Sequence, residues 1–196
     1  FALTLQLSAF KQSVLQGDMG LSQKSPEPGN ASYYYSMTRL PTQGQVHLQG
    51  ESFDVAGQSW LDREWSTSAL ASDQSGWDWF SLQFTDGTEL MYYQLRDDLG
   101  STHPNSSGNF TSLMGLQVPI SPEDIQLEEQ VHWLAADGTS YTTQWRMEHA
   151  GNDLIIRAAF DDQLMDVTFQ YWEGAVDVID RVSGEKIGQG YLEMVR

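Results

Sequence analysis

The stretch GQSWLDREWSTSALASDQSGWDWFSLQFTDGTELMYYQLR, residues 57–96, decides how this chain is organised. It holds four of the seven tryptophans and two adjacent tyrosines. Five charged residues stand among these rings: Asp62, Arg63, Glu64, Asp78 and Arg96. A buried, unpaired charge is costly, so charges within aromatic strands need a partner or a function. We therefore expect the functional site in this stretch.

Three runs within it, residues 60–66, 77–84 and 89–96, alternate as β-strands do. Asp86-Gly87 between the last two runs is a strong hairpin signal. The alternation divides each strand into two faces: Trp60, Asp62 and Glu64 against Leu61, Arg63 and Trp65; Trp77, Trp79 and Ser81 against Asp78, Phe80, Leu82 and Phe84; Leu90, Tyr92, Gln94 and Arg96 against Met91, Tyr93 and Leu95.

Short strand-like runs joined by Gly and Asp turns continue on both sides of this stretch. Residues 1–7 and 31–40 read as strands, 14–29 as a loop and 41–44 as a turn, and Gly50 marks a hairpin. No long run has a helical period. Because both faces of several strands carry large side chains, we predict an all-β fold, an antiparallel barrel of roughly eight to ten strands.

Composition excludes several classes of function. The chain has 196 residues, enough for one domain plus an appendage, and a formal net charge of −17. With 27 acidic and 10 basic residues, it is poorly suited to bind nucleic acid or anionic lipid headgroups. There is no cysteine, which excludes disulfides and thiolate sites and fits an exported bacterial protein. No apolar run is long enough for a membrane span.

Metal and cofactor motifs are absent from the sequence. The four histidines lie far apart, without HxH or HExxH spacing. There is no GxGxxG after a strand, no GxxxxGK[ST] loop and no GxSxG elbow. We expect neither a metal nor a cofactor.

Asp62 and Glu64 are two residues apart and share a strand face. Together with Asp78 they are the candidate catalytic acids, because burial can separate the pKa values of paired carboxyl groups. The alternative is that these carboxylates form salt bridges. We predict that all three are at least partly buried and that at least two contact an arginine among Arg39, Arg63, Arg96 and Arg146.

The segments LQGDMGLSQKSPEPGNASYYYSMTRL, GQSWLDREWS, GWDWFSLQFTDGTELMYYQLR, YWEGAV and GYLEM resemble the AttH-like / carotenoid hydratase (hydroxyneurosporene synthase) family, from about Leu15 to the end of the chain. The resemblance implies two lipocalin-like (calycin) β-barrels in tandem. Residues 31–196 would be the C-terminal barrel, and residues 1–30 a linker or remnant strand of a missing N-terminal lipocalin-like domain. We expect a periplasmic or extracellular protein.

The chain departs from the hydratase pattern at two positions. At the position of Arg63 the hydratases carry a histidine, whereas their tryptophan is retained here as Trp65. The Tyr-x-Asp of the hydratases corresponds to Tyr92-Tyr93-Gln94, with an amide in place of the acid. Hydration of an alkene needs a proton donor, which neither Gln94 nor a permanently protonated Arg63 supplies.

The family resemblance implies an elongated apolar ligand, and three functions remain open. The first is binding of a lipid, isoprenoid or polyene; the second is an enzyme that isomerises, cyclises or hydrates such a molecule; the third is packing against the missing domain. The predicted ligand contacts are Trp60, Arg63, Trp65, Trp77, Trp79, Tyr92, Tyr93, Gln94, Arg96, Trp172 and Glu173.

Overall fold

The computed structural model describes residues 1–66, 70–167 and 170–196. In this part of the chain the regular structure is antiparallel β-sheet, apart from one 3-10 turn at Pro122–Asp124. None of its helical residues forms a segment long and apolar enough to cross a membrane. The predicted all-β class is therefore confirmed.

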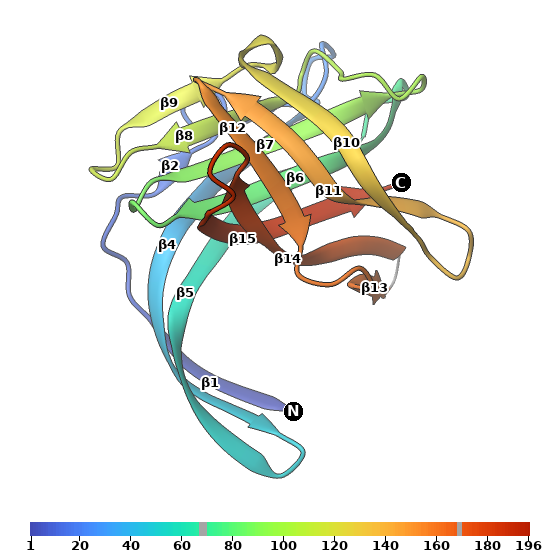
Figure 1. The fold of residues 1–196 in the computed structure, drawn as a ribbon. Helices are drawn as coiled ribbons and strands as arrows, with labels where there is room; N and C mark the ends of the chain where they lie inside the picture. The colour runs from blue at the N-terminus through green and yellow to red at the C-terminus, as the bar shows by residue number, and fades with distance from the viewer. Residues whose placement is uncertain (67–69, 168–169) are drawn as a thin grey trace.

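The larger sheet has ten strands and curls into a half-barrel (Figure 1). Its order is β10-β11-β12-β14-β15-β6-β7-β8-β9, with β13 added to β14. The strands are β6 (Gln74–Phe84), β7 (Glu89–Asp97), β8 (Ser107–Thr111), β9 (Gln117–Ile120), β10 (Ile125–Leu134), β11 (Ser140–His149), β12 (Asn152–Ala158), β13 (Leu164–Asp166), β14 (Gln170–Asp180) and β15 (Lys186–Val195).

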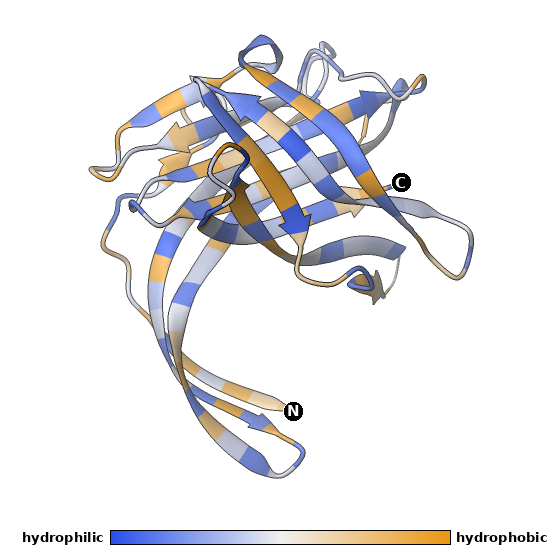
Figure 2. Cartoon of the chain, viewed as in Figure 1, coloured by the Kyte–Doolittle hydropathy of each residue, from blue (hydrophilic) through white to orange (hydrophobic). Residues whose placement is uncertain are grey.

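The smaller sheet is built on one long hairpin, β4 (Ala31–Leu48) and β5 (Glu51–Ser66). Three further strands pair with β4: β1 (Ala2–Leu7), β2 (Val14–Leu15) and β3 (Leu21–Gln23). The hairpin and β1 extend beyond the curled sheet, and Figure 2 shows this arm as alternating hydrophilic and hydrophobic bands. That pattern is typical of antiparallel strands with one apolar and one polar face.

Two local expectations are wrong here. The segment 14–29 contains β2 and β3 instead of being entirely loop, and β4 continues through Pro41–Gly44, which was expected to turn. The carbonyl oxygen of Pro41 accepts a hydrogen bond from the Ser8 amide at 3.1 Å, so the ring nitrogen of Pro41 also lies on the side of β1, just beyond its end at Leu7. Because the missing N–H would not point toward β5, β4 tolerates Pro41. The hairpin expected at Gly50 is confirmed, with positive φ at Gln49 and Gly50.

The chain passes from the smaller sheet to the larger one after β5. Ala31, the expected start of the C-terminal barrel, therefore does not separate the two sheets. Residues 31–66 pair with β1, β2 and β3, while the curled sheet begins at Gln74. Whether residues 1–30 belong to a preceding domain stays a prediction.

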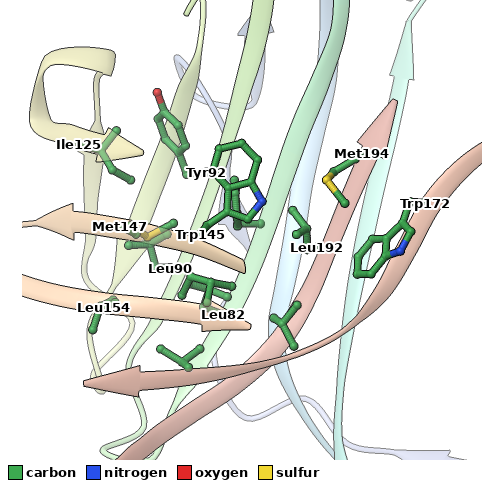
Figure 3. Close-up of a cluster of buried hydrophobic side chains, with 14 of the residues drawn as sticks. Leu82, Leu90, Tyr92, Ile125, Trp145, Met147, Leu154, Trp172, Leu192 and Met194 are labelled. Atoms are coloured by element: carbon green, nitrogen blue, oxygen red, sulfur yellow. The ribbon is translucent and has the colours of Figure 1, made fainter. Parts of the chain in front are cut away.

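The inside of the curled sheet is filled with its own side chains (Figure 3). Four aromatic side chains in it expose at most 1% of their surface: Phe80, Tyr92, Trp145 and Trp172. The rings of Phe80 and Trp145 meet edge-to-face, with their centroids 5.6 Å apart. The opposite face of β6 and β7 belongs to a second cluster, which contains Met91, Tyr93 and Leu95; its further members are Tyr34, Trp60, Leu70, Trp77 and Trp79. The predicted two-faced alternation of β6 and β7 is thus confirmed.

A buried carboxylate connects the two sheets. Glu89 on β7 is fully buried and accepts hydrogen bonds from Lys11 Nζ at 2.8 Å and from Arg39 Nε at 2.5 Å. Arg39 Nη2 also donates to the carbonyls of Phe84 and Thr88 at 2.9 and 3.1 Å. Arg39 lies on β4, so this cluster fixes the long hairpin to the β6–β7 turn.

We predict that Glu89→Gln destabilises the protein by about 3–5 kcal/mol, because it leaves two partly buried cations without their counter-charge. Urea unfolding followed by tryptophan fluorescence measures the change. The control is Glu128→Gln, which removes an exposed carboxylate 3.6 Å from Arg146 and should cost less than about 1 kcal/mol. Equal losses in the two variants would contradict the role assigned to Glu89.

Candidate functional site

An open cavity of about 1130 Å³ lies between the two sheets. One wall comes from β4 and β5, and the other from β6, β7, β14 and β15. At its edge the Gln83 amide donates to the carbonyls of Thr38 and Ser59, at 2.8 and 3.3 Å, and so ties the walls together. The volume lies just above the usual range of ligand pockets, about 300–1,000 Å³.

Large aromatic rings line both walls of the cavity. Trp60 of β5 meets Trp79 of β6 edge-to-face, with ring centroids 6.4 Å apart and planes at 83°. Trp77 and Tyr93 extend the same wall as Trp79. Trp65, half exposed, lies at the end of β5. These rings offer a large apolar contact area to a ligand.

Asp62 is held in the cavity by neutral donors. Tyr34 Oη donates to Asp62 Oδ2 at 2.7 Å, and Trp60 Nε1 donates to Oδ1 at 2.8 Å. Trp79 Nε1 in turn donates to Tyr34 Oη at 3.0 Å. Although Asp62 has accessible surface, that surface faces the cavity, and burial among its walls raises the pKa of the Asp62 carboxyl above its usual range. The hydrogen bonds from Ser36, Tyr34 and Trp60 oppose this shift only in part.

Glu64, the second candidate acid, is paired with a lysine. Lys24 Nζ lies 3.0 Å from Glu64 Oε1, and Ser32 donates a short hydrogen bond to the same oxygen. The Lys24 ammonium also lies 3.8 Å from the centroid of the Tyr93 ring and 5.4 Å from that of Tyr34. Glu64 therefore has its counter-charge inside the cavity.

Two more carboxylates face the cavity from the curled sheet. Glu173 of β14 and Glu193 of β15 are direct cross-strand neighbours, and Trp77 Nε1 donates to Glu193 Oε1 at 2.6 Å. Burial raises the pKa of Glu193 above its usual range, and the nearby charge of Glu173 raises it further. On the same wall Lys186 pairs with Asp177 at 2.5 Å.

Asp78, the third candidate acid, does not reach the cavity. It is fully buried on the opposite face of β6, where Arg96 and Arg196 each donate to it from Nη1, at 2.5 and 2.6 Å. The expectation that at least two of the three carboxylates contact an arginine is wrong for the described residues: Asp78 does, whereas Asp62 and Glu64 are held by other groups. Asp78 is fully buried, whereas Asp62 and Glu64 keep more accessible surface in the cavity lining.

The predicted ligand contacts divide into two groups. Those that line the cavity are Trp60, Trp65, Trp77, Trp79, Tyr93 and Glu173. Tyr92 and Trp172 lie in the packed core, and Gln94 and Arg96 surround Asp78. Arg63 contacts Trp65, with its guanidinium 6.0 Å from the ring centroid.

Sequence reasoning missed many residues of the cavity lining, among them Lys24, Tyr34 and Glu193. Lys24 lies in the segment read as a loop, and Tyr34 lies on β4, whose facing was not assigned. Glu193 lies two residues after Tyr191 in the last strand, so alternation predicts that the two side chains share a strand face. Alternation does not predict that this face lines the cavity. No group of three His, Asp or Glu side chains within the described ranges is arranged to hold a metal ion.

The AttH-like family model matches residues 1–195. The chain belongs to the AttH-like family. A crystal structure of an AttH protein from Nitrosomonas europaea superposes with a TM-score of 0.90 at 33% sequence identity, and kievitone hydratase from Nectria haematococca with 0.78 at 17%. The two matches confirm the lipocalin-like fold. Each covers 98% of this chain and 60% of the other, so this chain spans about 60% of either relative. No functionally curated protein matches.

We predict that Glu193→Gln raises the melting temperature at pH 8. The folded-state pKa of Glu193 is raised, so the ionised carboxylate costs stability above that pKa, and the cost fades as the pH falls toward the unfolded value near 4.3. Gln still accepts the hydrogen bond from Trp77. Differential scanning calorimetry at pH 8 and pH 4.5 measures the effect, since about 1 kcal/mol shifts Tm by about 2–4 °C at this size. A variant less stable than the parent at pH 8 would contradict the assignment.

Proposed function

We propose that this protein binds an elongated apolar small molecule, a lipid, isoprenoid or polyene, in the cavity between its two sheets. The observation that carries the proposal is the contrast between the two faces of β6 and β7. The inner face is closed by packed side chains, whereas the outer face opens on about 1130 Å³ lined by tryptophan and tyrosine.

The wall chemistry suits such a ligand. Tyr34, Trp60 and Trp79 are rigid amphipathic side chains that supply contact area with little loss of side-chain entropy. Their N–H and O–H groups are already committed to Asp62 and to one another, so the rings are held in place before the ligand arrives. A preorganised pocket loses less free energy on binding.

The chain spans about 60% of the length of its solved relatives. We propose that a second lipocalin-like domain covers one side of the cavity, and that the whole protein acts outside the cytoplasm.

We predict that decanol and longer apolar alcohols quench the tryptophan fluorescence at micromolar concentration. Trp79→Leu should weaken binding several-fold, since one aromatic contact is worth about 0.5–1.5 kcal/mol beyond its area. Calorimetry measures the affinity, because removing a tryptophan also changes the fluorescence.

Trp133→Leu is the matched control, because Trp133 packs against Tyr141 of the neighbouring strand, outside the cavity lining. Both variants are compared with the parent after circular dichroism has shown that they fold. Equal loss of affinity in the two variants, or no binding of any apolar alcohol or polyene to the parent, would refute the proposal.

A second candidate function is acid catalysis on the same ligand class, favoured by the raised pKa of Asp62. A carboxyl group that stays protonated to higher pH can donate its proton to a polyene, and the faces of Trp60 and Trp79 can stabilise the resulting cation. A hydratase shares the fold, although at 17% identity this similarity concerns the fold alone.

Conversion of a polyene by the protein, followed by mass spectrometry, tests this candidate. We predict that Asp62→Asn abolishes turnover and leaves binding of the polyene within a few-fold, because the amide cannot supply the proton. Equal turnover by Asp62→Asn would exclude Asp62 as the acid, and absence of turnover by the parent would leave binding as the function.

A further inference from the structure

We propose that the ligand of the cavity between the sheets carries a positive charge, an ammonium or trialkylammonium group at one end of its apolar chain. This inference rests on the proposed binding function and adds the charge of the ligand to it. It follows from the balance of charge in the cavity and from the way the cavity holds an ammonium of its own.

The lining of the cavity contains more negative groups than positive ones. Five carboxylates face it, Asp62, Glu64, Glu173, Asp177 and Glu193, against the ammonium groups of Lys24 and Lys186. Both lysines are already paired, with Glu64 at 3.0 Å and with Asp177 at 2.5 Å.

Three carboxylates in the lining therefore lack a cationic partner. Among the described residues, no lysine, arginine or histidine lies within salt-bridge distance of Asp62, Glu173 or Glu193. Asp62 and Glu193 instead accept hydrogen bonds from neutral groups, Tyr34 and Trp60 for the former and Trp77 for the latter.

Lys24 shows how this cavity accommodates an ammonium group. Its Nζ lies 3.8 Å from the centroid of the Tyr93 ring, 5.4 Å from that of Tyr34, and 3.0 Å from Glu64 Oε1. Only 12% of its side-chain surface is exposed. Two aromatic faces and a carboxylate are the elements of the aromatic cages that bind quaternary ammonium ligands.

A carboxylate pair on β14 and β15, with the indole N–H of Trp77 from β6 beside it, has no cationic partner among the described residues. Glu173 and Glu193 are direct cross-strand neighbours, and the indole of Trp77 lies against Glu193. Like charges directly opposite one another on a sheet are destabilising. A cation beside this pair would relieve the repulsion, whereas an anionic headgroup would increase it.

Three ligands that share a ten-carbon chain test the proposal: decyltrimethylammonium, decanol and decanoate, each below the concentration at which it forms micelles. We expect the cation to bind about tenfold more tightly than decanol at pH 8, and decanoate to bind most weakly. Isothermal titration calorimetry gives the three affinities under one condition of salt.

Variants distinguish the cavity carboxylates from the overall charge of −17, which also attracts cations. Glu173→Gln and Glu193→Gln should each weaken decyltrimethylammonium several-fold and leave decanol unchanged. Glu51→Gln removes the same charge at the exposed tip of the β4–β5 hairpin, so it should change neither affinity.

Each other outcome has a definite meaning. If decanol and decyltrimethylammonium bind equally well, the inference about charge is wrong and the proposed binding function stands. If Glu51→Gln weakens the cation as much as Glu193→Gln does, the attraction comes from the whole surface and the inference is again wrong. If none of the three ligands binds, both the proposed binding function and the inference about the charge of the ligand are wrong.

Discussion

The strict alternation of side chains along β6 and β7 is the constraint on which this structure depends. Successive side chains of a strand point to opposite faces, so residues 77–84 can serve two environments. Phe80 and Leu82 enter the packed core, while Trp77 and Trp79 face the smaller sheet. A shift of register by one residue would exchange the two sets and bury Trp77 and Trp79 where Phe80 now fits.

That alternation is also what the sequence revealed best. The strands, the hairpins at Gly50 and Asp86-Gly87, and the two faces of residues 77–96 follow from periodicity and turn chemistry. The division into two sheets does not, because pairing between β1 and the far half of β4 is a tertiary contact. The same contact carries β4 past Pro41, where local propensity predicts a turn.

The candidate site was predictable by residue type but not by location. The aromatic residues of 60–79 were identified, yet periodicity cannot tell which face of a strand meets a packed core and which meets a cavity. Tyr92 and Trp172 illustrate the point, since both were expected at the ligand and both fill the core. Glu89 carried no signal at all, because its partners Lys11 and Arg39 are distant in the sequence.

The treatment of charge separates structural carboxylates from those of the cavity. Glu89 and Asp78 are fully buried, and each contacts two cations. Asp62 and Glu193 lie against neutral donors, and the pKa of each is raised by burial. The chain has only ten basic residues, and it places four of them on the two structural carboxylates. Ionisable groups with shifted pKa values and no counter-charge beside an open cavity are typical of functional sites, because they remain available to interact with a ligand. The distribution of cations therefore supports the same location for the site as the aromatic walls do.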